Sequence, residues 1–326
     1  MWNSTTDLNN NFSKEDTMMF VDECVIDTKE YYGEFWDKAM KGKNGNYEKM
    51  KVGKASNGMF VLPYDSNRRY LAALTEESFF RKMATSVNVS KSQNVIWGLD
   101  SEDVAECVAE GGSINVSDMA DDFTKFKSEP HKIAGIVTLP NDYAHDRAFE
   151  LDKYLPKRLA KCFNRAEETV FLNGDGADKP AGVLHDTEGA EVGVTTAEIT
   201  FDDVISLYMS VKPKYRKKGV WVMNDETALA LRKLKDADGN YIWNHNTDTI
   251  LGKPVHILEY MPGATSGSKP ILFGDFSYYW IINRRPLAVR TLAEKFALND
   301  LTGYLAVEYL DARLIRREAI KTLQIS

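Results

Sequence analysis

The sequence predicts a mixed α+β protein with a long projecting β-hairpin, and three observations carry this prediction. Apolar residues alternate with polar ones over residues 87–99 and again over 123–139, which is typical of paired strands. Residues 153–171 carry an apolar stripe with helical period. From residue 200 onward, short apolar strands alternate with capped helices. The length of 326 residues favours about two domains.

The N-terminal residues 1–54 are mostly polar and contain one amphipathic segment, residues 18–40. We expect a helix there, followed by a loose connection rich in Gly, Lys and Asn at 41–46. The helix either packs on the core of its own chain or forms an arm that docks on a neighbouring subunit or a scaffold.

A short apolar strand at 58–63 and a helix at 66–82 precede the predicted hairpin. With about 12 residues in each arm, the hairpin would reach on the order of 40 Å at ~3.3 Å per residue. A two-stranded hairpin alone is only marginally stable in water, so the sequence implies a partner surface for it.

The long helix at 153–171 is expected to begin with Asp152 as its cap and to end at Asn173 and Gly174. Pro156 falls near the start of this helix, where the backbone N–H has no intrahelical acceptor. At 1.5 Å per residue the helix would span ~30 Å, long enough to act as a strut.

The C-terminal half is predicted to be an α/β module. Thr200 or Asp202 caps a helix over 201–211, and Asn224 caps a helix over 226–235. Strands are expected at 219–223, 254–258, 270–273, 279–282, 304–315 and 319–325.

The charge of the chain is concentrated in one segment. The net charge is −7, which does not favour a dedicated nucleic-acid-binding protein with a basic domain. Residues 100–129 alone carry nine acidic and two basic side chains, a local charge of −7. We therefore expect an acidic projecting arm that binds basic surface on neighbouring subunits.

Cysteine usage and hydropathy point to a reducing interior without a membrane. Cys24, Cys107 and Cys162 show neither zinc spacing nor a disulfide framework. The N-terminus lacks the pattern of a signal peptide, and no apolar stretch approaches the ~20 residues that span a bilayer.

Motifs that would carry catalysis are missing from the sequence. The turn at Gly174-Asp175-Gly176 leaves a helix instead of entering one, so it is a helix stop and not a phosphate-binding loop. The five histidines form no HxH or HxxxH pair. The neighbouring Glu167 and Glu168 are expected either on a solvated helix face or as partners of a helix N-terminal dipole. We expect no catalytic, cofactor-binding or metal-binding residues.

Two sets of charged residues are candidates for contacts. A basic run is either an exposed loop before a buried strand or a surface that faces DNA or a neighbouring subunit; it comprises Lys212, Lys214, Arg216, Lys217 and Lys218. The candidate inter-subunit contacts are Glu102, Asp103, Glu106, Glu110, Asp121, Asp122, Arg284, Arg285, Arg316 and Arg317.

Six strings, in order along the chain, resemble the major capsid protein of tailed bacteriophages, the Hong Kong 97-type family. They are Gly58-Met59-Phe60-Val61-Leu62-Pro63, Phe171-Leu172-Asn173-Gly174-Asp175-Gly176 with Pro180-Ala181-Gly182-Val183-Leu184, Trp221-Val222-Met223-Asn224, Leu231-Arg232-Lys233-Leu234-Lys235-Asp236 with Gly239, Leu251-Gly252-Lys253-Pro254-Val255, and Phe273-Gly274-Asp275-Phe276. The resemblance covers roughly residues 55–326.

This resemblance implies a Hong Kong 97-type capsid fold and a division of the chain. Residues 1–54 would be an N-terminal arm or a short scaffold-like segment, and 88–138 the extended arm loop. The peripheral domain, with the long spine helix, would comprise 55–87, 139–199 and 286–315. The axial α/β domain would comprise 200–285 and 316–326.

The implied function is that of a major capsid protein of a tailed bacteriophage or prophage. Pentamers and hexamers of the chain would form an icosahedral shell around packaged double-stranded DNA, without sequence-specific binding. Scaffolding, portal and decoration proteins are possible partners. The protein would be assembled in the bacterial host cytoplasm and would reside in the virion.

Two features depart from some relatives. Only about 54 residues precede the resembling region, so we expect a retained arm, with proteolytic removal as the alternative. Some relatives join an arm-loop Lys to an Asn with the help of a Glu. Asn299 and Glu308 lie in about the right region, but residues 101–124 contain no Lys, so we expect noncovalent cohesion. The alternative functions are an encapsulin-like nanocompartment shell holding a cargo enzyme and, less favoured, a soluble α/β enzyme.

Overall fold

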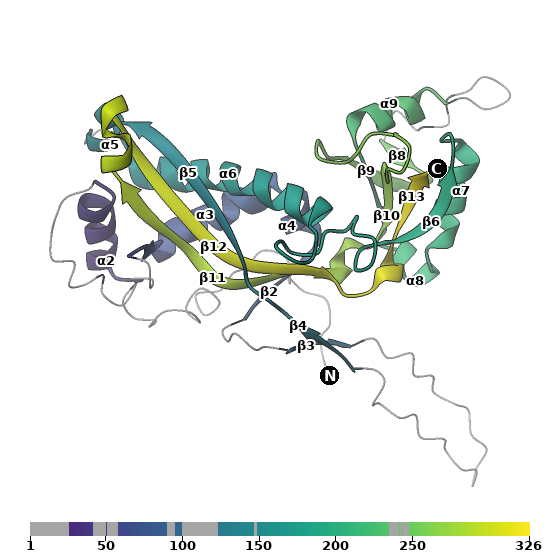
Figure 1. Ribbon diagram of the computed structural model, residues 1–326, viewed down its shortest axis with the longest axis horizontal. Helices are drawn as coiled ribbons and strands as arrows, with labels where there is room; N and C mark the ends of the chain where they lie inside the picture. The colour runs from purple at the N-terminus through teal and green to yellow at the C-terminus, as the bar shows by residue number, and fades with distance from the viewer. Residues whose placement is uncertain are drawn as a thin grey trace, which may run out of the picture.

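Two β-sheets organise the chain along its long axis (Figure 1). The computed structural model describes residues 26–41, 50, 58–89, 95–99, 123–146, 149–234, 241, 243 and 248–326. Sheet 1 contains β1 (Phe60–Val61), β11 (Tyr279–Leu292), β12 (Leu301–Leu314) and β5 (His131–Pro140) in that order, with β2 (Thr85–Asn88) beside β11. Sheet 2 has the order β6 (Glu191–Thr196), β13 (Ile320–Ile325), β10 (Ile271–Gly274), β7 (Val220–Met223), β9 (Lys253–Ile257) and β8 (Thr249–Ile250). The mixed α+β class predicted from the sequence is confirmed.

Sheet 1 is built on the long antiparallel pair of β11 and β12. Each strand has 14 residues, so β11 extends far beyond the predicted segment 279–282. A 3-10 turn, η5 (Glu294–Asn299), connects the two strands, and Asp300 leaves it in the left-handed conformation with φ 54°. Asp and Asn tolerate this conformation better than most residues do, which suits Asp300 to the turn.

The two sheets share apolar packing. β12 leads through η6 (Arg317–Ala319) directly into β13 of sheet 2. Successive residues of β7 point to opposite faces of sheet 2. Val220 and Val222 pack in the large core that includes sheet 1, whereas Trp221 and Met223 pack in a second core on the other face. Sheet 2 is therefore fixed to sheet 1 by shared core residues as well as by the chain connection.

The long helix α6 (Leu151–Asn173) confirms the predicted strut and lies along sheet 1 (Figure 1). Asp152 is not the cap of α6, because it lies inside the helix, which begins at Leu151. Glu150 is at the cap position, and its side chain makes no capping hydrogen bond. Pro156 cannot donate to the carbonyl of Asp152. Arg69 Nη1 approaches that carbonyl oxygen at 3.4 Å and partly replaces the lost donor.

The helix predicted over 66–82 is two helices, α3 (Tyr64–Glu77) and α4 (Phe79–Met83). Ser78 between them has an extended backbone, and its hydroxyl accepts a hydrogen bond from the Arg81 N–H at 3.2 Å. Serine is a favoured N-cap because its side chain satisfies such a free backbone donor. The prediction of one continuous helix was wrong at this point.

The N-terminal segment packs on its own chain where it is described. α2 (Lys29–Glu34) continues into a π-helical turn, η1 (Phe35–Ala39). Tyr31 and Phe35 are fully buried, and the Tyr31 hydroxyl donates to the Val61 carbonyl at 2.7 Å. Of the two alternatives for this helix, packing on its own core therefore holds for residues 26–41. The rest of the predicted segment, residues 18–25, lies outside the described residues.

The described part of the predicted hairpin is one pair of five-residue strands. β3 (Val95–Leu99) pairs antiparallel with β4 (Phe123–Lys127), and Figure 1 shows this pair projecting away from sheet 1. Residues 131–140, which we expected in the returning arm, instead pair with β12 as the edge strand β5. Residues 85–88 likewise join sheet 1, as a strand parallel to β11. The prediction erred because alternation does not identify the partner of a strand.

Helices α7 (Phe201–Ser210) and α9 (Asp225–Arg232) pack on the second core of sheet 2. Thr200, not Asp202, caps α7 through a capping box with Asp203, and Asn224 caps α9 as predicted. Among the helices of the described ranges, none combines the length and the apolar character that a membrane span requires.

Candidate subunit-contact and DNA-contact surfaces

The acidic candidates of the arm lie outside the described residues: Glu102, Asp103, Glu106, Glu110, Asp121 and Asp122. Their role in subunit contacts stays a prediction.

Arg284 and Arg285, adjacent on β11, have different surroundings. Arg284 is only 5 % exposed, and its Nη2 donates to the Ser128 carbonyl at 2.6 Å. Burial lowers the pKa of Arg284, against the opposing effect of Asp311. Arg285 is exposed and lies over the Tyr309 ring at 5.4 Å. Of the two, only Arg285 offers its guanidinium to a neighbouring molecule.

Arg316 and Arg317 lie between β12 and β13. Arg317 donates from Nε to the Gly189 carbonyl at 2.9 Å and from Nη2 to the Asp186 carbonyl at 3.1 Å. Arg316 is half-buried. Arg317 therefore holds the loop before β6 against η6, a role inside the subunit that the sequence did not reveal.

The basic run lies at the corner of sheet 2, where the short helix α8 (Pro213–Arg216) precedes the buried strand β7. Glu318 neutralises part of it, with Oε2 at 2.6 Å from Lys212 Nζ and Oε1 at 4.0 Å from Lys214 Nζ. The buried Tyr215 donates its hydroxyl to the same carboxylate at 2.7 Å. Although partial burial raises the pKa of Glu318, these partners lower it overall.

The other three residues of the basic run differ in their exposure. Arg216 lies over the Tyr208 ring at 5.4 Å, and its Nη1 lies 3.1 Å from the Met209 sulfur. Lys217 and Lys218 are exposed. The position just before a buried strand is as predicted, and a contact of this run with DNA or a neighbouring subunit stays a prediction.

A buried ionic cluster beneath α6 was missed by the sequence analysis. Glu167 and Glu168 are buried, not solvated as we expected. Glu167 binds Arg81 of α4 at two points, and Glu168 accepts from the Phe79 N–H at 3.2 Å. The i,i+1 spacing of two acids on a helix gave no sign of these partners, which lie some 86 and 89 residues away in sequence.

Glu308 of β12 completes this cluster. It is almost fully buried, and the Tyr70 hydroxyl donates to its Oε2 at 3.0 Å. Burial, followed by the adjacent Glu167 carboxylate, raises the pKa of Glu308 well above its ordinary value, although Arg81 opposes the shift. The cluster thus holds three carboxyl groups and one guanidinium, and the raised pKa of Glu308 favours the neutral form, which reduces the excess of buried negative charge.

The geometry separates the two residues considered for a covalent crosslink. Asn299 is exposed in η5, before β12 begins at Leu301, whereas Glu308 is buried within that strand. Seven strand residues correspond to roughly 24 Å at ~3.4 Å per residue. Asn299 and Glu308 of one subunit therefore cannot act on the same bond, and noncovalent cohesion stays a prediction.

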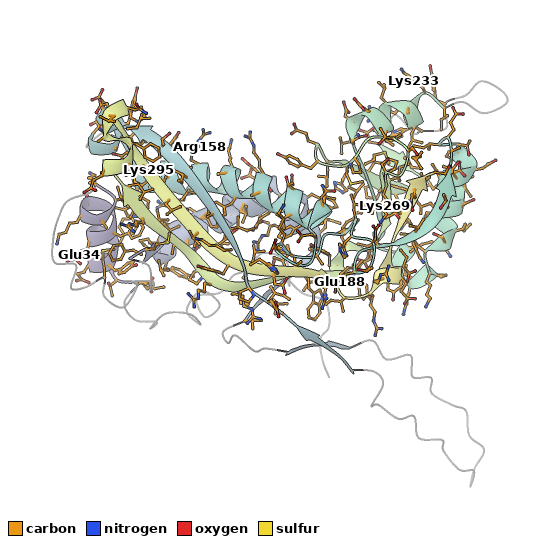
Figure 2. All side chains as sticks on the ribbon, in the orientation of Figure 1. Glu34, Arg158, Glu188, Lys233, Lys269 and Lys295 are labelled. Atoms are coloured by element: carbon orange, nitrogen blue, oxygen red, sulfur yellow. The ribbon has the colours of Figure 1, made fainter. Side chains whose placement is uncertain are left out.

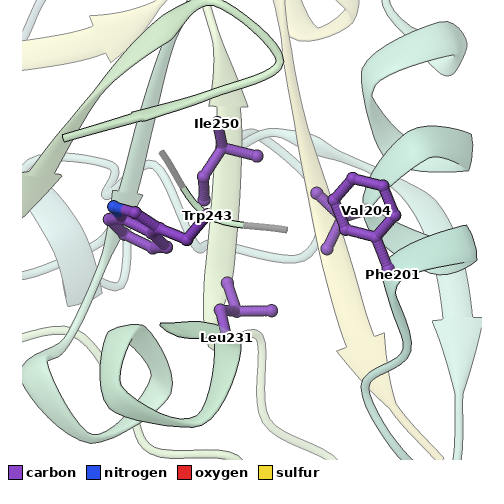
Figure 3. A pocket seen from close by; sticks show the side chains of 5 residues that line it. All are labelled: Phe201, Val204, Leu231, Trp243 and Ile250. Atoms are coloured by element: carbon purple, nitrogen blue, oxygen red, sulfur yellow. The ribbon is translucent and has the colours of Figure 1, made fainter. Parts of the chain in front are cut away.

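An apolar cavity of about 10 Å³ lies between α7, α9 and β8 (Figure 3). Its lining side chains are Phe201, Val204, Leu231, Trp243 and Ile250. It is at most large enough for one water molecule and offers that water few polar partners.

In the part of the chain that the structure describes, no group of three or more His, Cys, Asp or Glu is placed to hold a metal ion.

Comparisons with known proteins agree with this architecture. Residues 58–325 match the model of the phage capsid family. The chain is similar to the capsid of an empty GTA particle computed with C5 symmetry, at 26 % identity and a TM-score of 0.62, over 78 % of this chain and 90 % of that one. The capsid of the native GTA particle matches over the same shares, at 26 % identity and a TM-score of 0.60.

The fold also matches a more distant structure. The satellite phage P4 procapsid, including the size determination protein, aligns at 14 % identity with a TM-score of 0.52, over 79 % of this chain and 91 % of that one. No curated protein sequence matches the chain significantly. The family match spans far more than half of the 326 residues and takes in both sheets, α6 and the β3–β4 pair. The chain belongs to the phage capsid family.

Proposed function

We propose that this protein is the major capsid protein of a tailed bacteriophage or prophage and forms an icosahedral shell around double-stranded DNA. The observation that supports the capsid function is that the chain belongs to the phage capsid family. Closed shells of this symmetry are made from pentamers and hexamers, and we assign both kinds of ring to this chain. The GTA capsid structures, at 26 % identity over most of both chains, support a similar arrangement.

The β3–β4 hairpin supports assembly on physical grounds. Its two strands pair with each other and project from the body (Figure 1). Because a two-stranded hairpin gains little stability alone in water, a neighbouring subunit is its natural support. The net charge of −7 in residues 100–129 makes basic surface on that neighbour the expected partner.

The remaining parts of the proposal concern partners and place. Scaffolding, portal and decoration proteins would meet the shell during its assembly in the bacterial host cytoplasm, and the finished protein would reside in the virion. The role is structural, with no cofactor and no catalysis.

Sedimentation and negative-stain electron microscopy of the purified full-length chain test this proposal. We expect closed shells, formed by the chain alone or with its scaffold, and nuclease-protected DNA in particles from producing cells. Shells that contain a cargo enzyme instead of DNA would identify a nanocompartment. A chain that stays small under every assembly condition and turns over a substrate would be an enzyme and not a capsid protein.

A further inference from the structure

The exposed side of α6 is strongly basic. The helix carries five cationic side chains, and all five are exposed: Lys153, Lys157, Arg158, Lys161 and Arg165. At 100° per residue they fall within about 140° of arc and extend over ~18 Å of the helix. Arg158 projects from the helix on the side away from β11 and β12 (Figure 2). We call these five residues the basic face of α6.

The acidic residues of the same helix do not neutralise this face. Asp152 binds Arg69 at 3.1 Å and the Tyr32 hydroxyl at 2.6 Å. Glu167 and Glu168 are buried in the cluster that faces α4. All three carboxylates of α6 are thus used inside the subunit.

Only two of the five cations have ion pairs within the described part of the subunit. Lys153 lies 2.6 Å from Glu150 and Lys161 lies 3.4 Å from Glu77, and both pairs are exposed. Exposed pairs of this kind contribute little and exchange readily for other anions. Lys157, Arg158 and Arg165 make no ion pair with any described residue, so their charge is available to a partner.

We propose that the basic face of α6 lines the inside of the shell and contacts the phosphate backbone of the enclosed DNA without reading its sequence. This inference rests on the proposed capsid function and adds to it a specific DNA-contact surface. An array of cations along one helix provides the electrostatic, sequence-independent attraction on which non-specific DNA binding depends. Lys and Arg are also the usual donors to phosphate oxygens.

The composition of the face favours a polyanion over another protein. Protein interfaces are depleted in Lys and enriched in aromatic residues and Met at their centres. Three of the five residues of the basic face are lysines, and of the exposed large apolar side chains only Tyr154 adjoins them on α6. The basic run at 212–218 is a weaker candidate, because Arg216 is half-buried over the Tyr208 ring and only four of its five cations are exposed.

Charge reversal tests the proposal on the full-length chain. The test variant carries Lys157→Glu, Arg158→Glu and Arg165→Glu. The matched control makes the same charge change at three exposed cations elsewhere: Lys179→Glu, Arg290→Glu and Lys295→Glu. Binding of unassembled subunits to a random-sequence DNA duplex is measured over a series of salt concentrations. A neutral variant with Gln at 157, 158 and 165 serves if the reversal impairs folding.

We expect the test and neutral variants to bind the duplex more weakly and to lower the slope of log K against log salt by about 2.7, or ~0.9 for each lost phosphate contact. The control should keep the wild-type slope. A reconstruction of the wild-type shell should place the basic face towards the lumen.

Equal losses in test and control variants would overturn the proposal, as would an outward-facing α6. Loss of assembly with unchanged duplex binding would identify the face as a subunit contact instead, which also overturns it. If the wild-type chain forms shells in any of these cases, the proposed capsid function is still supported. The DNA-contact role of the basic face and the capsid function can therefore be refuted independently.

Discussion

Arg81 and Glu167 form a two-point ion pair buried between α4 and α6. Arg81 Nε donates to Glu167 Oε2 at 2.9 Å, and Nη2 binds Oε1 of the same carboxylate. Arg81 Nη1 also donates to Asn283 Oδ1 on β11 at 2.9 Å. One guanidinium thereby joins two helices and the central strand of sheet 1, which fixes the long strut on the sheet that it supports.

The first prediction concerns this pair. Arg81→Met should lower the free energy of unfolding of the unassembled subunit by about 3–5 kcal/mol, because it leaves Glu167 buried without its partner. Urea denaturation measures the change. Arg158→Met on the exposed side of α6 is the control and should stay within about 0.5 kcal/mol of wild type. Equal effects of the two substitutions would show that the buried pair is not a structural link.

The second prediction concerns Glu308, whose pKa is raised in the folded protein. Between its ordinary value, about 4.3, and its raised folded value, the folded state binds more protons than the unfolded state, so stability falls as pH rises. Glu308→Gln is always neutral and keeps an acceptor for Tyr70. The stability of this variant relative to wild type should therefore increase from pH 5 to pH 8.

Urea denaturation of both proteins at the two pH values measures this change. Groups such as Asp152, whose pKa is lowered in the folded state, act alike in both proteins and cancel in the comparison. An unchanged difference between pH 5 and pH 8 would mean that Glu308 is ionised in the folded protein.

The sequence predicted the elements whose signals are local. The apolar stripe of α6 and the cap at Asn224 depend on residues a few positions apart, and both predictions are confirmed. The break at Ser78 was missed because a serine suits either a helix interior or a cap, and the apolar spacing continues across it. The choice depends on what the flanking helices pack against.

Pairings between distant segments could not be predicted in this way. Residues 85–88 pair with β11 nearly 200 positions later, and the alternation of 131–140 gave no sign that its partner is β12. The same limit applies to the surfaces. Arg284 was expected at a subunit contact, but it is buried and donates to the Ser128 carbonyl. The basic face of α6 was missed because the sequence prediction of this helix considered only its apolar positions.

The third prediction concerns Gly174 at the end of α6. A Cβ there would lie 1.9 Å from the Pro180 carbonyl oxygen and 2.7 Å from that of Val170, so backbone must move. Gly174→Ala should cost at least about 1–3 kcal/mol, the usual range for overpacking. Gly33→Ala in α2 is the control, since its Cβ would meet no atom within 4 Å. Thermal unfolding that ranks the two variants equally would contradict the packing described here.

The fourth prediction concerns the acidic arm. Reversing the charge of Glu102, Asp103, Glu106 and Glu110 should impair shell assembly while the subunit still folds, because the arm would no longer be attracted to basic surface on its neighbour. Light scattering follows assembly, and circular dichroism follows folding.

A control for the arm reverses four exposed acids in other parts of the chain: Glu76, Asp142, Glu198 and Glu294. This control should assemble more efficiently than the arm variant. Normal assembly of the arm variant would mean that the acidic charge of the arm serves solubility and not subunit contacts.

A cryo-electron microscopy reconstruction of particles assembled from the purified full-length chain shows directly whether this protein forms a capsid. We predict a closed icosahedral shell whose pentamers and hexamers are both fitted by this fold, with each β3–β4 hairpin on a neighbouring subunit. Monomers or small closed oligomers under all assembly conditions, scaffold included, would contradict it.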